Sequence, residues 1–285
     1  MDHLYRELAP IPAAAWDQIE SEAKSRLVTY LAARKLVDFS GPHGWGHSAT
    51  DLGRVDEVTG PGEGVAALRR RVLPLVELRV DFAVSREELD DADRGTGNIE
   101  LPELDLAVRQ IALAENSTVF HGYAAAGMLG ITEQSSHSPI AIEADMEQYP
   151  KVVAQATDAL RQAGIGGPYG LAIDPAIYTV IVETAEHGGF LLLDHLRQIL
   201  GGPLVWAPGV EGGVVLSLRG GDFVLDCGRT SPSATETTTP RSSGSTSRRA
   251  SASASSSPTL PWRFDGPDRI TGASGPAGRM GRVRT

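Results

Sequence analysis

Residues 73–95 carry the clearest pattern of hydrophobic and polar positions in the chain. Apolar side chains occupy every second position, with mostly charged or small ones between them: Val76, Leu78, Val80, Phe82 and Val84 alternate with Glu77, Arg79, Asp81, Ala83 and Ser85. A period of two predicts a strand with one buried face. Ser85, followed three residues later by Glu88, predicts the capping box of a short acidic helix that ends at Gly95.

The same strand continues backwards through residues 68–75 and needs a partner. The expected partner is a strand at 52–58, joined to it through the glycine-rich tip at 60–64. A long two-stranded arm has little to bury by itself. We therefore expect the arm to contact a neighbouring chain, which indicates assembly rather than catalysis. The residues predicted to make this contact are Leu75, Val76, Glu77, Leu78, Arg79 and Val80.

Helical periodicity dominates most of the remaining chain. Apolar residues at helical spacing, such as Trp16, Ile19 and Ala23, predict long helices at 13–36 and 98–122. Shorter helices are expected at 149–163, 175–184 and 191–200. Strands are expected at 171–173, 204–207, 214–218 and 222–225, with the last two joined by the turn at 219–221. This mixture of separate helices and strands predicts an α+β fold.

Composition narrows the partners and the cellular location. The formal net charge of the 285 residues is −10, so nucleic acid is not expected as a partner. Cys227 is the only cysteine, which rules out an intramolecular disulfide and suits the reducing cytosol. The N-terminus lacks an apolar signal segment, and no apolar run is long enough to span a bilayer. We expect a cytoplasmic protein that binds no membrane.

Residue types that carry chemistry do not form a recognisable site. His43 and His47 are four apart, but the two glycines between them disfavour the helix that such a zinc site needs, and no third ligand is apparent. No phosphate-binding loop, dinucleotide fingerprint or serine-hydrolase motif occurs. Serine, histidine and aspartate residues are scattered without a pattern that places a nucleophile. We therefore predict no catalytic residue, no metal and no cofactor.

Several consecutive motifs are similar to those of one protein family. In chain order they are LYRELAPI, AARKLVDFSGPHGW, LPLVELRVDF, ELDDADRG, GPYGLAIDP and RGGDFVL, and they cover residues 1 to about 228. The chain resembles family 1 encapsulins, the shell proteins of bacterial nanocompartments, also known as the linocin-type bacteriocin family. The resemblance implies the HK97 phage-capsid fold. Its parts would be an N-terminal helical arm (1–40), an extended-loop hairpin (41–85), a peripheral domain (86–131, with return strands at 211–228) and an axial domain (132–210).

The resemblance also implies a function. Family members self-assemble into icosahedral shells around a cargo enzyme, such as a dye-decolourising peroxidase or a ferritin-like iron protein, which links them to oxidative stress and iron storage. The cargo's C-terminal targeting peptide would dock on Leu27, Leu31, Arg34 and Asp38; alternatively, Arg34 and Asp38 form an ion pair with each other. His187, Gly188 and Gly189 would form a pore loop, or else an ordinary exposed loop.

Two other functions compete with the shell. The older family name suggests a secreted bacteriocin or a peptidase, although no signal segment or nucleophile motif supports it. A capsid protein that still serves in a virion is the third possibility. Neighbouring genes would separate these alternatives, since a peroxidase or ferritin-like gene favours the nanocompartment.

The tail from residue 229 onward departs from the family. Residues 229–285 are rich in serine and threonine and hold nine arginines against three acids, a charge of +6. One interpretation is a disordered basic tail. The other is a reading-frame shift near Gly228, because losing one base lets GRTSPSAT decode as the family-like GQDLAIGY. A frameshifted chain would lack strands of the peripheral domain, leave sheet edges without partners and assemble poorly.

Overall fold

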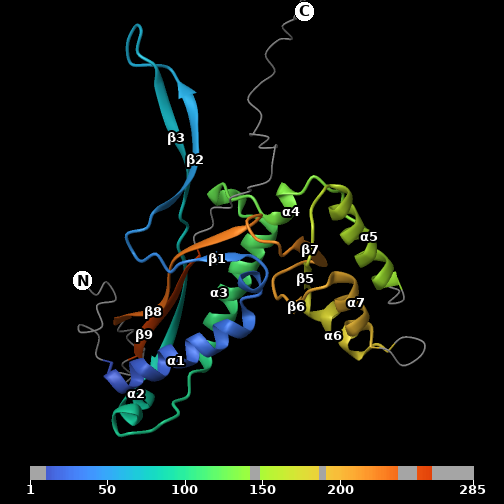
Figure 1. Ribbon diagram of the computed structural model, residues 1–285. Coiled ribbons are helices and arrows are strands. Elements are labelled where there is room, and N and C mark those ends of the chain that lie inside the picture. The colour runs from blue at the N-terminus through green and yellow to red at the C-terminus, as the bar shows by residue number, and fades with distance from the viewer. Residues whose placement is uncertain (1–10, 142–147, 186–190, 237–248, 259–285) are drawn as a thin grey trace, which may run out of the picture.

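The computed structural model describes residues 11–141, 148–185, 191–236 and 249–258 (Figure 1). The helices are α1 (Ala13–Tyr30), α2 (Arg86–Asp93), α3 (Pro102–His121), α4 (Ile131–Gln134), α5 (Tyr149–Gln162), α6 (Pro175–Glu183) and α7 (Leu192–Leu200), with 3-10 turns η2 (Ala33–Lys35) and η3 (Ala124–Ala126). The strands are β1 (Asp38–Ser40), β2 (Ala49–Val58), β3 (Ala67–Pro74), β4 (Leu78–Ser85), β5 (Tyr169–Ile173), β6 (Leu204–Trp206), β7 (Gly213–Ser217), β8 (Val224–Glu236) and β9 (Arg249–Pro258). This is an α+β fold, as the sequence predicts.

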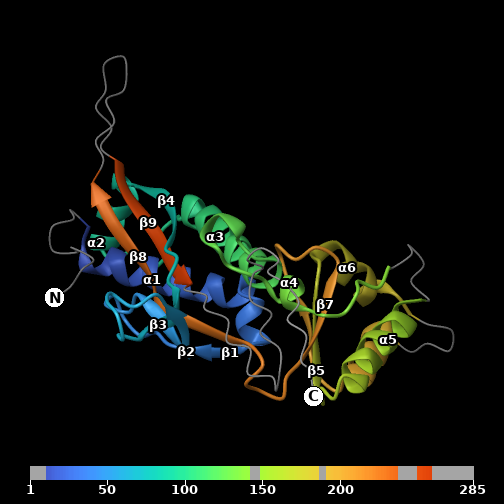
Figure 2. The ribbon, with the colours of Figure 1, turned by 90° about the horizontal axis from the view of Figure 1, so that it is seen from above.

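A four-stranded sheet of order β1-β8-β9-β4 forms one region of the molecule, which we call the four-stranded region. β1 runs parallel to β8, and the other neighbours are antiparallel. Helices α1, α2 and α3 lie at this end (Figure 2). The core between them joins Trp16 and Ile19 of α1, Leu89 of α2, Leu104 of α3 and Phe82 of β4, all buried.

A three-stranded sheet of order β6-β5-β7, with helices α5, α6 and α7 beside it, forms the other end (Figure 2). β5 is buried along its whole length, as expected for a central strand. We call this part the three-stranded region. A second core cluster connects the two regions, because Phe120 of α3 and Leu225 of β8 belong to the same buried cluster as Val205 and Leu216.

The β2–β3 hairpin projects away from both regions (Figure 1). The two strands pair with each other and with no third strand in the described part of the chain. At the tip, a Cβ on Gly60 would lie 1.7 Å from the carbonyl oxygen of Val65, so the turn requires glycine there. The predicted pairing of 52–58 with the arginine-rich strand is therefore confirmed.

The arm is shorter than the predicted range 41–85. The chain breaks between β3 and β4, where Leu75 donates its N–H to the Ser48 carbonyl and Val76 packs against the second core cluster. Leu78, Arg79 and Val80 then belong to β4, which pairs with β9 in the four-stranded sheet. The residues expected to contact a neighbouring chain thus lie at the base of the arm and in the body. The regular alternation from Val76 to Ser85 begins before β4 does, and so it did not mark the point where the backbone leaves the hairpin.

Two further local predictions, the capping box of α2 and the hairpin at the turn 219–221, are only partly right or wrong. Ser85 accepts from the Glu88 N–H at 3.1 Å as expected, but the Glu88 carboxylate accepts from the Glu100 N–H at 2.8 Å, so only half of the capping box forms. The strands on either side of the turn at 219–221 do not form a hairpin, because β7 pairs with β5 and β8 pairs with β1 and β9. Gly220 and Gly221, both at positive φ, carry the chain from one sheet to the other.

The beginning of the tail is extended rather than disordered. β8 continues through residues 229–236, and β9 comes from 249–258, so both strands extend into the range expected to be a disordered basic tail. β9 lies between β8 and β4, and it covers the edge of β4 that a missing segment would have left open. Small serine and alanine residues allow this, since sheet pairing uses only backbone groups. The remainder of the tail lies outside the described residues.

Candidate functional site

The four residues predicted to hold a peptide differ in their exposure to solvent. Leu31 is buried, and Leu27 is half-buried against the core of α1, α2, α3 and β4. Helix α1 ends at Tyr30, six residues before the predicted end at residue 36. Asn116 of α3 binds the backbone just after this end. Its side-chain oxygen accepts from the N–H groups of Ala32 and Ala33 at 3.0 and 3.1 Å.

Arg34 is held by α3. Its Nε and Nη2 donate to the two carboxylate oxygens of Glu115, each at 2.7 Å, and Glu115 is fully buried. Burial alone lowers the pKa of Arg34, but the hydrogen bonds and charge of Glu115 outweigh burial and raise that pKa. The guanidinium also lies 4.9 Å from the ring centroid of the exposed Phe39. Arg34 therefore holds the segment after α1 against α3, and its guanidinium packs over the ring of Phe39.

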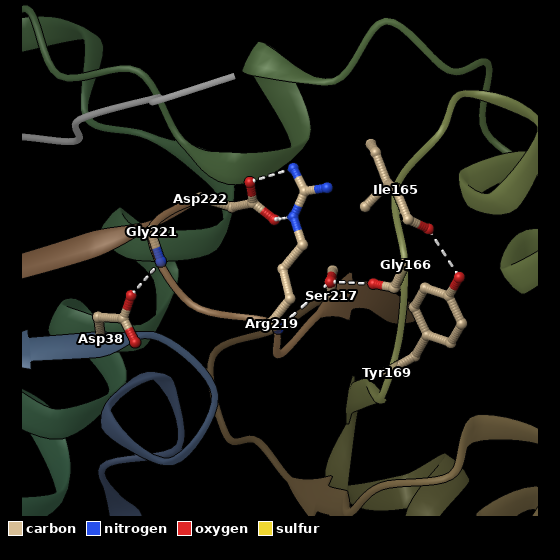
Figure 3. A network of polar contacts seen from close by, with 8 residues as sticks. All are labelled: Asp38, Ile165, Gly166, Tyr169, Ser217, Arg219, Gly221 and Asp222. Atoms are coloured by element: carbon tan, nitrogen blue, oxygen red, sulfur yellow. Dashed lines mark hydrogen bonds and ion pairs between the residues drawn. The ribbon is translucent and has the colours of Figure 1, made fainter. Parts of the chain in front are cut away.

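Asp38 is the predicted residue that faces an open site. It is exposed, and its Oδ2 accepts from the Gly221 N–H at 2.5 Å (Figure 3). A cavity of about 200 Å³ lies beside it, between β1 and the turn that leads from β7 to β8. The cavity is lined by Lys35, Leu36, Val37, Asp38, Ser217, Leu218, Gly220, Asp222 and Phe223. We call it the Asp38 pocket.

The wall of the Asp38 pocket is held rigid by polar contacts. Arg219 donates two hydrogen bonds, of 2.8 and 2.7 Å, to the Asp222 carboxylate. The Ser217 hydroxyl donates to the Gly166 carbonyl (Figure 3). The bond with Asp222 raises the pKa of Arg219. Because Asp222 is already paired, Asp38 and Lys35 remain the charged side chains of the pocket, next to apolar Leu218 and Phe223. Such a pocket suits an apolar anchor flanked by a charge.

Sequence reasoning missed the far wall of this pocket. Leu218, Asp222 and Phe223 lie about 180 positions from Asp38, and the pattern of the sequence did not place them beside it. The motif RGGDFVL, noted for its resemblance, contains two of them. Its paired glycines were the available signal, because they mark a tight turn whose N–H groups can meet a carboxylate.

A serine, a histidine and an aspartate meet at the base of the hairpin. His43 Nε2 lies 2.8 Å from Ser40 Oγ and 3.6 Å from Asp226 Oδ1, and Thr50 of β2 donates to the other Asp226 oxygen. In a catalytic triad the aspartate binds the opposite ring nitrogen from the serine. Here both approach Nε2, so the cluster has the geometry of an anchor for the hairpin.

The Asp226 carboxylate is nearly buried in this anchor. Burial works to raise its pKa, but hydrogen bonds from Thr50 and Ser40 and the nearby His43 outweigh burial, and the pKa lies below its usual range. The rings of His43 and His47 lie against each other at a tilt of 46°, with centroids 4.6 Å apart. Across the described ranges, no group of three or more His, Cys, Asp or Glu side chains is arranged to hold a metal. The predicted pore residues His187, Gly188 and Gly189 lie outside those ranges.

Comparison with known proteins gives a consistent family. Residues 1–231 match the family Linocin_M18, described as encapsulating protein for peroxidase. A type 1 encapsulin shell protein of Rhodospirillum rubrum is 43% identical over 235 residues, which cover 80% of this chain and 84% of that protein. One from Mycolicibacterium paratuberculosis is 41% identical over 228 residues, covering 80% and 86%.

A solved structure supports the fold. The virus-like particle from Pyrococcus furiosus is 15% identical, with a TM-score of 0.55, and the similarity covers 87% of this chain and 94% of that chain. At this identity the likeness concerns the fold alone, and that fold is the HK97-like capsid fold. Among the helices that the structure describes, none has the length and apolarity needed to cross a membrane.

Proposed function

This chain belongs to the Linocin_M18 family of type 1 encapsulin shell proteins, and from that premise we propose that it is a non-enzymatic shell subunit that encloses a cargo enzyme. The β2–β3 hairpin carries the proposal. It projects from the body with Val55 and Leu68 more than half exposed, and such a hairpin gains little by remaining alone in water. Contact with other subunits would cover it.

The proposed cargo is a peroxidase. Support comes from the family description, which names a peroxidase. A ferritin-like iron protein is the second candidate, from the resemblance alone. The compartment would lie in the bacterial cytoplasm, which suits a chain whose one cysteine is buried. The peptidase alternative gains no support from Ser40, His43 and Asp226, because their geometry differs from that of a triad.

We place the cargo's targeting peptide on the Asp38 pocket. The pocket offers an apolar wall at Leu218 and Phe223 and a charged rim at Asp38 and Lys35. An extended peptide with an apolar anchor and a basic residue would fit both features.

The assembly proposal is tested with the purified full chain. Size-exclusion chromatography and electron microscopy should show closed particles of uniform diameter at micromolar concentration. The proposed function would be contradicted if both this chain and a version with the family-like continuation after Gly228 remained folded monomers as the concentration is raised.

The docking proposal needs a separate test. The chain is co-expressed with a peroxidase that has or lacks its C-terminal tail, and the peroxidase retained in purified particles is measured. Asp38→Lys should leave particle formation intact and reduce retention of the tailed peroxidase about tenfold, because one charged anchor is reversed. Asp17→Lys, an exposed change on α1, is the matched control. Equal retention by both variants would remove the pocket from the docking site.

A further inference from the structure

A second cavity lies on the β2–β3 hairpin and shares no lining residue with the Asp38 pocket. The hairpin that carries it projects from the body (Figure 1). The cavity has a volume of about 210 Å³ and is lined by Asp51, Gly53, Arg54, Val55, Arg70 and Arg71. We call it the arginine cavity. Because the whole chain has a formal net charge of −10, three arginines around one cavity run against its overall sign.

The arginine cavity lies where the pairing of the two strands is interrupted. On both sides of it β2 and β3 pair in regular antiparallel register, but the three residues 52–54 of β2 stand opposite the single residue Arg71 of β3. Such a bulge bends the strand and changes the direction of the side chains next to it. Gly53 has a φ of 65° and adds no side chain that could fill the space. The bulge therefore leaves a hollow with Arg54 on one strand and Arg70 on the other.

The three arginines differ in whether a carboxylate already holds them. Arg71 donates from its Nε to Asp56 at 2.5 Å, and the hydrogen bond and charge of Asp56 raise the pKa of Arg71. Arg54 and Arg70 are exposed, and neither guanidinium forms an ion pair or a hydrogen bond with any residue in the described part of the chain. Two guanidiniums of the cavity wall are thus available to a ligand.

The chemistry of these two side chains favours an oxyanion. A guanidinium presents a planar fork of N–H donors that matches two oxygens of a phosphate or a carboxylate. Asp51, the acidic residue of the lining, offsets one of the two available charges, so the cavity keeps a net positive charge. A carboxylate has two oxygens in all, whereas a tetrahedral oxyanion has enough to meet the forks of both Arg54 and Arg70.

We propose that the arginine cavity is a binding site for a tetrahedral oxyanion of the phosphate class, held between the guanidiniums of Arg54 and Arg70. Arg71 adds positive charge to the wall while it remains bound to Asp56. All of these residues belong to one hairpin of one chain, so the site does not depend on the proposed shell function. The ligand is either free phosphate or the phosphate group of a small phosphomonoester.

A phosphate titration tests the site on the purified full chain. Phosphorus NMR of inorganic phosphate, with the ionic strength held at about 0.1 M by sodium chloride, should show saturable binding. Arg54→Gln and Arg70→Gln should each weaken binding at least about fivefold, because each removes one fork of donors. Arg70→Lys keeps the charge without the fork, and its affinity should lie between those of the parent and Arg70→Gln. Arg109→Gln, at an exposed arginine of α3, is the matched control and should bind like the parent.

Every variant is taken from the same size-exclusion fraction, so that the assembly state is equal throughout. The hairpin strands lie outside the three core clusters of the described residues, so all variants should melt like the parent. A response that does not saturate in the parent, an equal loss of affinity in Arg109→Gln, or unchanged affinity when Arg54→Gln and Arg70→Gln are combined would overturn the proposal. Glycerol 2-phosphate as a second probe identifies the source of the ligand: tighter binding than inorganic phosphate assigns the site to phosphomonoesters, and equal or weaker binding assigns it to free phosphate.

Discussion

At the residue scale, the carboxamide of Asn116 meets four backbone groups. It accepts from Ala32 and Ala33, and it donates to the carbonyls of Tyr30 and Pro208, each at 2.8 Å. Asn116 is fully buried, so a backbone group that loses its hydrogen bond to Asn116 cannot replace it with one to water. The Asn116 side chain thus ends α1. It also connects α3 to the end of α1 and to the segment that follows β6.

We expect Asn116→Ala to lower the free energy of unfolding by about 3 kcal/mol, since several buried backbone groups lose their partner. Thermal unfolding followed by circular dichroism measures the loss. Asn98→Ala, at the chain's other asparagine, is exposed and should change the melting temperature little. Equal melting of both variants would show that water replaces the amide.

Asp226 gives a prediction about pH. Because its pKa in the folded protein lies below the unfolded value, its contribution to stability is complete above the unfolded pKa of about 3.9 and disappears as the pH falls through the folded value. The parent should therefore lose stability more steeply than Asp226→Asn on acidification from pH 5 to pH 3, although the variant is less stable at pH 7. Melting temperatures across this range provide the test, with the exposed Asp51→Asn as control. Parallel curves for parent and Asp226→Asn would contradict it.

At the element scale, the hairpin and the body are separable. No residue of β2 or β3 belongs to the three core clusters of the described residues, and the tip of the hairpin depends on Gly60. Gly60→Ala would force a methyl group against the Val65 carbonyl and strain the turn by about 1–3 kcal/mol. Gly62→Ala meets nothing within 4 Å and is the matched control.

We expect Gly60→Ala to keep the melting temperature of the body and to reduce the yield of assembled particles, because the tip of the hairpin loses its shape. Gly62→Ala should do neither. Size-exclusion profiles at equal concentration, read beside thermal melts, make the comparison. Full assembly by Gly60→Ala would show that the tip has no part in subunit contact.

At the scale of the whole molecule, the local pattern of apolar residues predicted most helices and strands. It failed where contacts with residues far away in the sequence determine where an element ends. The helices 149–163 and 175–184 appear nearly as predicted, because each has a proline in its first turn and apolar residues at helical spacing, and Asp174 caps the second of them. Helix α1 stops six residues early, because Asn116, more than eighty positions away, takes the N–H groups of Ala32 and Ala33. In the candidate site, the family resemblance had named Asp38, whereas Glu115, the partner of Arg34, and Phe223, in the pocket wall, come from remote segments.

The tail gives a prediction about the gene. The family match ends at residue 231, close to the point where the composition changes. If the reading frame has shifted, sequencing across the codons of Cys227 to Thr230 should show one missing base relative to a version that encodes the family-like continuation. The restored chain should then yield more particles than the present one. An intact gene that encodes Arg229 and the residues after it would end this hypothesis.

The amide of Asn116 also bears on particle geometry. Together with the shared cluster around Phe120 and Val205, it joins the two sheets of a subunit into one piece with a fixed angle between them. Summed over many copies, that angle determines the curvature of a closed wall, and curvature determines diameter. Asn116→Ala should therefore broaden the distribution of diameters seen by electron microscopy, even where its particles still close.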